Sequence, residues 1–256
     1  MRRRCAVAAA ALAGACAASP HALPPEPTAT TEWHAEPVFA TATAQNIVVH
    51  DHAGPITALL VDWIAQIGQT QYDFLLDYVG AGPEWVHVHV GANYPYGFAI
   101  ASRPFPEMFL EARGILDTSN NWAHEMTHCF NSYFGELPHW FNESLADVVY
   151  ADSEIELYQR VSEAEMLKRF DRVDNRSYEL MQLRARYGRQ YFRKVYRAML
   201  ARLAESRRVL RSDEALEDRN RFILSVLSEA AGENLAPVFE TEFGFNVRTR
   251  ERQRGY

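Results

Sequence analysis

Cysteine is scarce in this chain, and long uninterrupted hydrophobic runs are absent from its body. Three cysteines among 256 residues exclude a scaffold held together by many disulfide bonds. Beyond the N-terminus, no apolar run reaches the roughly 18 residues that a membrane-spanning helix needs. The sequence also has no glycine-rich phosphate loop and no internal repeat. These absences leave a globular domain whose function has to come from the chemistry of particular side chains.

Positive charge is also in short supply. The chain has 26 Lys and Arg against 33 Asp and Glu, which gives a net charge of -7. An acidic chain is a poor partner for nucleic acid, so we expect no nucleic-acid binding. Hydrophobic residues make up 48% of the chain and aromatic residues 12%. This composition supports a folded core, and the length favours a single domain with a tail.

The first 17 residues have the composition of an export signal. Three arginines at positions 2–4 precede a short apolar segment over residues 5–12, and a run of small residues follows. The apolar segment is too short to be a permanent membrane anchor. The pattern predicts a secretory signal peptide over residues 1–17.

Two processing routes fit this signal. Residues 12–16 read Leu-Ala-Gly-Ala-Cys, which resembles a bacterial lipoprotein cleavage box with the leucine four rather than three residues before the cysteine. On this route Cys16 becomes a lipidated N-terminus, and its lipid is the only membrane contact we expect. The small residues equally suit an ordinary signal peptidase. Both routes predict an exported protein, located in the periplasm, anchored to the outer membrane as a lipoprotein, or outside the cell.

The remainder divides into a tether and one domain. Residues 18–45 are rich in Pro, Ala and Thr without helical or strand periodicity, which predicts a flexible tether. Residues 46–256 form the predicted domain, an α+β fold in which a strand-containing N-terminal lobe precedes a mostly helical C-terminal lobe. In the first lobe the hydrophobic periodicity predicts strands at 47–50, 85–90, 96–102 and 107–111 and a helix over 55–79.

The strongest chemical signal is the segment His-Glu-Met-Thr-His at residues 124–128. Residues four apart lie on one face of a helix, so His124 and His128 can share one tetrahedral metal ion. Glu125 lies beside them and can take a proton from a metal-activated water molecule. The five-residue pattern alone is weak, because about one chain in a hundred of this length contains it by chance. The residues that follow therefore decide its meaning.

A third ligand follows on the next helix. Residues 135–138 read Gly-Glu-Leu-Pro, a tight connection, and a second helix is predicted to begin near the proline. In an antiparallel helix pair, Glu143 comes nearly level with His128, which makes it the predicted third ligand. Three protein ligands leave one position for water, as in catalytic zinc sites, so we expect one Zn²⁺ ion. Asp147, one turn further on, is the predicted acceptor for the second ring N–H of a ligand histidine.

The pattern H-E-x-x-H followed by W-x-N-E-x-x-A-D resembles the gluzincin zinc metallopeptidases over about residues 119–150. That group includes thermolysin-like, aminopeptidase-N-like and enhancin-like enzymes. The resemblance implies a zincin-like fold with the active-site helix between the two lobes, zinc bound by His124, His128 and Glu143, and Glu125 as general base. It also implies a peptide or protein substrate. Two departures are the short gap of 14 residues between His128 and Glu143 and the lack of a G-x-M-E-N segment. The second departure favours an endopeptidase.

Hydrolysis also needs a donor that stabilises the oxyanion. Four tyrosines follow the site, and we select Tyr178 because it opens a predicted helix after a loop. The strand histidines His87 and His89 have no carboxylate or cysteine at ligand spacing, so a second metal site there is disfavoured. An alternative function remains: a catalytically inactive lipoprotein with a peptidase fold that serves as a binding or assembly factor of the cell envelope. The intact His124, Glu125, His128 and Glu143 favour the enzyme.

Overall fold

The computed structural model describes residues 37–92, 94, 97–100, 106–116, 122–171 and 175–250. The predicted signal peptide, Cys16 and most of the predicted tether lie outside the described residues. Within the described part, no helix is both long enough and apolar enough to cross a membrane.

A mixed five-stranded sheet occupies the N-terminal half, in the order β1-β2-β3-β5-β4. The three inner strands run parallel, and the two edge strands are antiparallel to their neighbours. Apolar, β-branched residues dominate β2 and β3, as expected for strands buried on both faces. The strands are β1 (Ala40–Thr43), β2 (Ile47–Asp51), β3 (Val86–Gly91), β4 (Phe98–Ile100) and β5 (Glu107–Glu111).

Helices account for most of the remaining chain, and nearly all of them follow the sheet in sequence. This order confirms the predicted α+β class, with the strands first and a mostly helical part after them. The helices are α1 (Pro55–Ala58), α2 (Val61–Val79), α3 (Ala112–Leu116), α4 (Trp122–Asn131), α5 (His139–Glu156), α6 (Glu163–Phe170), α7 (Tyr178–Tyr187), α8 (Tyr191–Ala201), α9 (Leu203–Val209), α10 (Leu216–Ala231) and α11 (Ala236–Thr241).

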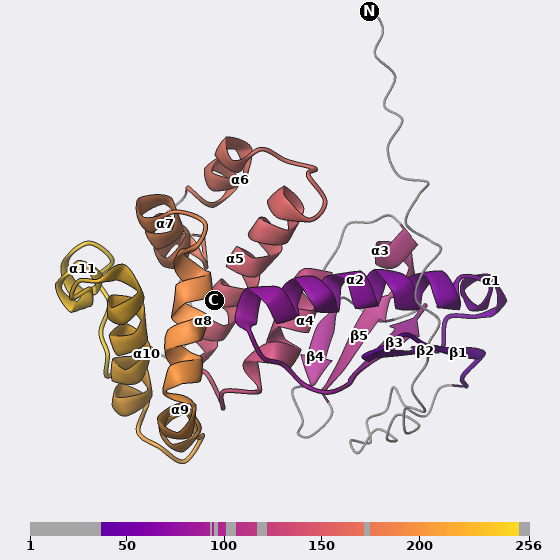
Figure 1. Ribbon diagram of the computed structural model, residues 1–256, viewed down its shortest axis with the longest axis horizontal. Helices are drawn as coiled ribbons and strands as arrows, with labels where there is room; N and C mark the ends of the chain where they lie inside the picture. Colours follow the sequence, from indigo (N-terminus) through magenta and orange to yellow (C-terminus); the bar gives the residue numbers. More distant parts are fainter. Residues whose placement is uncertain are drawn as a thin grey trace, which may run out of the picture.

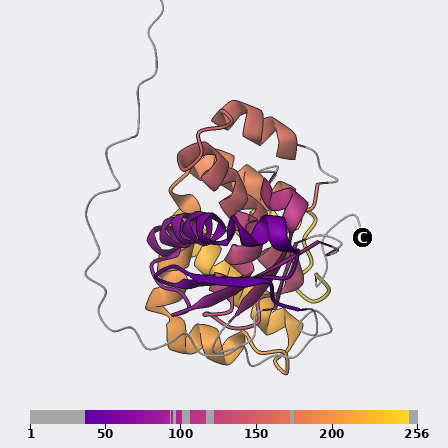
Figure 2. The same ribbon diagram turned by 90° about the vertical axis from the view of Figure 1, so that its right-hand side faces the viewer.

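Helices α2 and α4 cover one face of the sheet, and α4 also packs against α5 (Figure 1). In the view turned by 90°, the indigo helix α2 lies on one side of the strands, and the helices of the C-terminal half lie behind them (Figure 2). Helix α4 therefore lies at the junction between the strand-containing half and the helical half. Helix α4 is the helix that carries His124 and His128.

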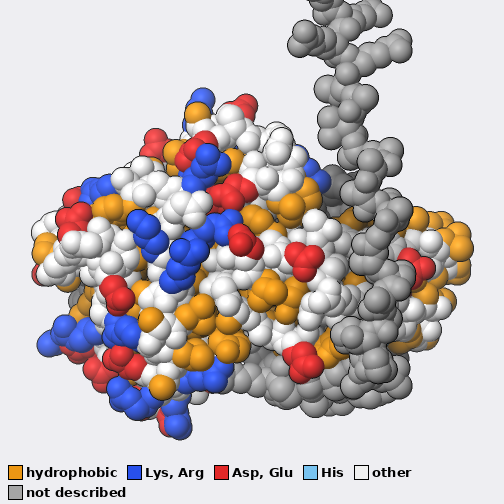
Figure 3. All heavy atoms as spheres, in the orientation of Figure 1, with side chains coloured by type: hydrophobic (Ala, Val, Ile, Leu, Met, Phe, Trp, Pro, Cys, Tyr) orange, Lys and Arg blue, Asp and Glu red, His pale blue; other side chains and the backbone are white. Residues whose placement is uncertain are grey.

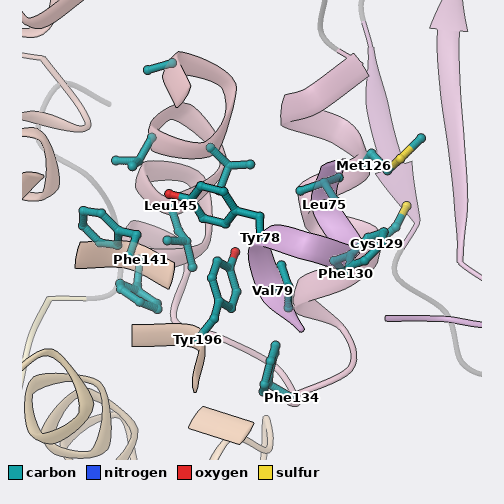
Figure 4. Close-up of a cluster of buried hydrophobic side chains, with 14 of the residues drawn as sticks. Leu75, Tyr78, Val79, Met126, Cys129, Phe130, Phe134, Phe141, Leu145 and Tyr196 are labelled. Atoms are coloured by element: carbon teal, nitrogen blue, oxygen red, sulfur yellow. The ribbon is translucent and has the colours of Figure 1, made fainter. Parts of the chain in front are cut away.

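The core runs through this junction without interruption (Figure 4). It contains Leu75 and Tyr78 of α2, Phe130 of α4, Phe141 of α5 and Tyr196 of α8, all at most 1% exposed. Burying large apolar side chains from four helices contributes about 1.5–3 kcal/mol per side chain relative to leaving them exposed. The two halves are thus one packed unit, and α4 is fixed from both sides.

The predicted boundary between tether and domain is wrong. Residues 40–43 form edge strand β1, and the Phe39 amide donates a hydrogen bond to the Asp51 carbonyl at 2.8 Å. The short Ala and Thr side chains of β1 do not alternate between large apolar and polar residues, so the sequence pattern did not predict a strand here. The strand is held mainly by backbone pairing with β2. The ordered domain therefore begins before residue 46.

Strand β3 also differs from expectation. Its alternating sequence predicted a half-buried strand, but all six residues are buried, including His87 and His89. His50 Nε2 lies 3.0 Å from His87 Nδ1, and His52 Nε2 lies 3.1 Å from His89 Nδ1. His89 Nε2 is in turn 3.1 Å from a Glu107 carboxylate oxygen. The strand histidines thus satisfy one another by hydrogen bonds, which is why polar residues are tolerated on this face.

We expect this network to make the fold sensitive to acid. Burial, together with the neighbouring His89 and His87, lowers the pKa of His50 to about 3. In the unfolded chain His50 is protonated below about pH 6.5, whereas in the folded chain it stays neutral down to about pH 3. The free energy of unfolding therefore decreases as the pH falls from about 6.5 toward 3. The limiting slope is about 1.4 kcal/mol per pH unit for one proton.

Urea unfolding of the wild type and of His50→Gln at several pH values between about 7 and 4 would measure this slope. The variant lacks the titrating group, so its unfolding free energy should fall less steeply. Equal slopes in the two proteins would contradict the assignment to His50.

Candidate metal centre

Helices α4 and α5 form an antiparallel pair joined by residues 132–138. The buried face of α4 packs on α2 and the sheet, and it carries Trp122, Met126 and Phe130. Gly135 in the connection has φ +135°, and a Cβ there would collide with the Leu210 carbonyl oxygen. Only glycine allows this close approach, so the turn between the two helices is tightly defined.

Three donor side chains converge across this helix pair. His124 Nε2 and His128 Nε2 are 3.2 Å apart. Glu143 places one carboxylate oxygen 3.5 Å from His124 Nε2 and the other 3.4 Å from His128 Nε2. The structure therefore brings together the three residues that the sequence spacing placed level with one another.

The triangle fits one tetrahedral metal ion. Nitrogen and oxygen donors at the usual zinc distances of about 2.0–2.2 Å lie roughly 3.3–3.6 Å apart when they occupy tetrahedral corners. The two histidine nitrogens are 3.2 Å apart, and the distances of 3.5 and 3.4 Å run to the two different oxygens of Glu143, so each pair of residues comes close to this requirement. With one ligand atom taken from each residue, the three donors lie within 4.8 Å of one another. Within the described part of the chain the group has three donors, and the Glu143 side chain is 21% exposed. Such a set can hold a metal ion and leave a coordination position open.

The carboxylate of Asp147 holds the first histidine in place. His124 Nδ1 lies 2.9 Å from Asp147 Oδ1, so the Nε2 atom of the same ring faces the other donors. This is the contact that the sequence predicted for Asp147. Burial alone would lower the pKa of His124, but hydrogen bonds with Asp147 and Glu143 outweigh it and raise the pKa to about 9. A metal ion would therefore compete with a proton for His124.

Arg176 is the residue that sequence reasoning missed. Its guanidinium binds both carboxylate oxygens of Asp147, at 2.7 and 2.8 Å, and one Nη atom lies 3.5 Å from a Glu143 oxygen. The Ser177 hydroxyl donates to Asp147 at 2.5 Å. Although burial raises the pKa of Asp147, the hydrogen bonds with His124 and Arg176 hold it well below its usual range. Asp147 is therefore an anion, suited to accept the His124 N–H.

Glu125 is 5% exposed. Burial raises its pKa to about 7, against the attraction of His124. A carboxyl that exchanges its proton near neutral pH is suited to act first as a base and then as an acid. The role of general base stays a prediction for Glu125.

His128 is held differently from His124. Burial and the neighbouring His124 lower its pKa to about 4, so it is a neutral imidazole, which is the form that binds metal. Asn142 lies next to it and accepts a hydrogen bond from Asn131 at 2.8 Å, and Asn131 accepts another from Tyr196. This buried chain fixes the wall behind His128.

The structure does not bring Tyr178 to the cluster. Its ring packs edge-on against Phe243, with the centroids 6.3 Å apart, and no hydrogen bond joins its hydroxyl to the metal-site residues within the described part of the chain. Tyr178 as oxyanion donor stays a prediction without a supporting contact. Cys129 is fully buried, and burial raises its thiol pKa, so it packs as a small apolar side chain.

No family model matches this chain, and no curated protein sequence is similar to it. The site is therefore interpreted from its own residues.

Removing the Asp147 carboxylate should weaken metal binding. The Asp147→Ala variant leaves His124 Nδ1 without its acceptor and Arg176 without its counter-ion, so we expect zinc affinity to fall about 10–100-fold. Competition with a chromophoric chelator measures the change. Glu156→Ala on the same helix is a matched control, because Glu156 pairs with Arg193 away from the cluster. Equal affinities of Asp147→Ala and the control would show that Asp147 does not orient a ligand.

Proposed function

We propose that this protein is an exported zinc-dependent peptidase of the gluzincin type, acting as an endopeptidase. The observation that carries the proposal is the convergence of His124, His128 and Glu143, whose ligand atoms lie within 4.8 Å of one another and form a donor set typical of zinc. Glu125 lies next to the first histidine, and Asp147 orients that histidine. A zincin-like fold agrees with the position of α4 between the sheet and the helical half.

When bound, zinc supplies Lewis-acid activation of water and of a substrate carbonyl. Glu125 takes the proton from the water and passes it to the leaving amine, for which a pKa of about 7 is well matched. Asp147 holds the His124 ring in one orientation, and Arg176 holds Asp147. The guanidinium of Arg176 also lies at the edge of the site, 3.5 Å from a Glu143 oxygen.

The backbone of a substrate peptide could pair with an edge strand of the sheet close to these residues. The outer strands of the sheet, β1 and β4, are both antiparallel to their neighbours. Strand β4 (Phe98–Ile100) contacts α4, which makes it the better-placed edge for an extended peptide. An extended substrate passing along a strand edge agrees with cleavage inside a chain.

The test is purification of the mature protein, elemental analysis for zinc, and digestion of a broad peptide library. We expect close to one zinc ion per chain and cleavage that a chelator abolishes and added zinc restores. A protein with no near-stoichiometric metal would overturn the proposal. Bound zinc without cleavage of any peptide would favour the alternative, an inactive peptidase-fold lipoprotein of the cell envelope.

Export belongs to the same proposal. Mass spectrometry of the mature N-terminus separates the two processing routes, since a lipidated Cys16 carries the mass of its acyl chains and simple cleavage adds nothing. An intact residue 1 in protein recovered from the producing cell would count against export.

A further inference from the structure

A cavity of about 520 Å³ lies directly beside the metal centre. It shares His128 and Asn142 with the site and extends along the end of α4, under the connection to α5 and toward the end of α9. This is large enough for one or two peptide side chains. Its lining is His128, Asn131, Ser132, Gly135, Glu136, Leu137, Asn142, Arg207, Leu210 and Arg211.

The walls of this cavity are fixed by hydrogen bonds between distant segments. The Glu136 amide donates to the Leu210 carbonyl at 2.7 Å, and the Ser206 hydroxyl donates to the Phe134 carbonyl at 3.0 Å. The close approach of Gly135 to Leu210 adds a third attachment. Helix α9 is therefore held against the helix connection, and the cavity is part of the folded structure rather than a gap between loose segments.

Arg207 is the charged group on this wall that is best prepared to bind an anion. Its Nε atom donates to the Tyr133 carbonyl at 3.0 Å, and its guanidinium lies over the Tyr133 ring, 4.6 Å from the centroid. Within the described residues Arg207 forms no ion pair, and no hydrogen bond uses its terminal Nη atoms. A guanidinium fixed at Nε with both Nη atoms available matches the two oxygens of a carboxylate.

The other charged groups of the cavity, Arg211 and Glu136, are less suited than Arg207 to bind a carboxylate. Arg211 is already paired with Asp213, with contacts of 2.6 and 2.8 Å. Glu136 forms no ion pair with either arginine in the described part of the chain. It is therefore the residue that would pair with a basic side chain of a substrate. The Leu137 and Leu210 side chains supply apolar contacts for the methylene groups of a longer side chain.

We propose that this cavity is a subsite for an acidic substrate side chain, with Arg207 as the counter-ion of its carboxylate. The inference rests on the proposed peptidase function, because the shared wall at His128 places the bound side chain close to the scissile bond. Peptides with Glu near the cleavage point are then the preferred substrates, since Glu combines a carboxylate with apolar methylene groups.

Cleavage of a peptide library by the zinc-loaded protein gives the first test. We expect Glu or Asp to be enriched at one position near the scissile bond, and Arg207→Glu to lower kcat/KM for those peptides about 10–100-fold, as for loss of a charge-assisted contact. The same variant should improve cleavage of peptides with Lys or Arg at that position. Arg208→Glu is the matched control, because it makes the same charge change on the same helix and lies outside the cavity lining.

A binding measurement separates failure of this inference from failure of the peptidase proposal. Titration calorimetry with blocked Ala-Glu-Ala, Ala-Leu-Ala and Ala-Lys-Ala, on zinc-loaded and zinc-free full-length Glu125→Gln protein, does not depend on turnover. Binding of the Glu peptide that Arg207→Glu removes and Arg208→Glu keeps would support the subsite even if no peptide is cleaved. A wild type that cleaves or binds all three peptides alike, or that prefers the Lys peptide through Glu136, would overturn it.

Discussion

Replacing Glu125 by Gln should lower kcat for peptide cleavage by about 10²–10⁴-fold, the usual contribution of a general base. Gln keeps the size and polarity of the side chain but cannot accept the proton of the attacking water. The Glu125 carboxyl is buried next to His124, and its burial, together with repulsion from Glu143, keeps its pKa near 7. The amide should fit the same space, so the fold and the donor triangle stay intact.

The measurement compares turnover and zinc content of the same preparations. Glu125→Gln should retain wild-type zinc stoichiometry, because Glu125 is not one of the three converging donors. A suitable control is Glu229→Gln on α10, an exposed carboxylate that is remote in sequence from the site. Unchanged turnover in Glu125→Gln would remove this residue from the mechanism, and joint loss of zinc and turnover would point to a ligand role instead.

Charges of both signs lie on the surface of the helical half. Acidic and basic side chains are interspersed over the helical half, with no extended field of one sign on the face shown in Figure 3. Several of the arginines are in ion pairs, such as Arg186 with Glu242 at 2.8 Å. The arginines in such pairs have neighbouring carboxylates as counter-ions, as on a solvated helical surface.

The sequence predicted the parts of the site that follow from helix geometry alone. His124 and His128 share a face because 3.6 residues make one turn, and the short connection sets the height of Glu143 on the returning helix. Asp147 follows from Glu143 by one further turn. Each of these relations is local, so no knowledge of the tertiary fold was needed.

The missed features all depend on contacts between segments far apart in the chain. Arg176 reaches the site from a loop after α6, and nothing in its sequence surroundings distinguishes it from the other arginines. Tyr178, two residues later, is turned toward Phe243 by the packing of the C-terminal helices. His87 and His89 looked half-exposed because the alternation of β3 is polar on one face, and only cross-strand histidine pairing makes burial of that face possible.

A buried ion pair between two segments far apart in the chain also supports the site. Arg184 of α7 and Asp152 of α5 are both fully buried, and Arg184 Nε donates to Asp152 Oδ1 at 2.7 Å. The Tyr78 hydroxyl of α2 donates to the other oxygen of Asp152 at 2.6 Å. Because α5 also carries Glu143 and Asp147, this pair fixes the helix that holds half of the metal site against the rest of the core.

Arg184→Met should therefore lower the free energy of unfolding by about 3–5 kcal/mol, because it leaves the Asp152 carboxylate buried without its cation. Most of that cost comes from the stranded charge, so the double variant Arg184→Met, Asp152→Leu should be more stable than Arg184→Met alone. Urea unfolding measures both, and Arg211→Met, which breaks the exposed pair with Asp213, should cost less than about 1 kcal/mol. If the double variant were less stable than the single one, the charge would not be the source of the cost. The contact of Asp152 with Tyr78 would then be the interaction that positions α5, and with it Glu143.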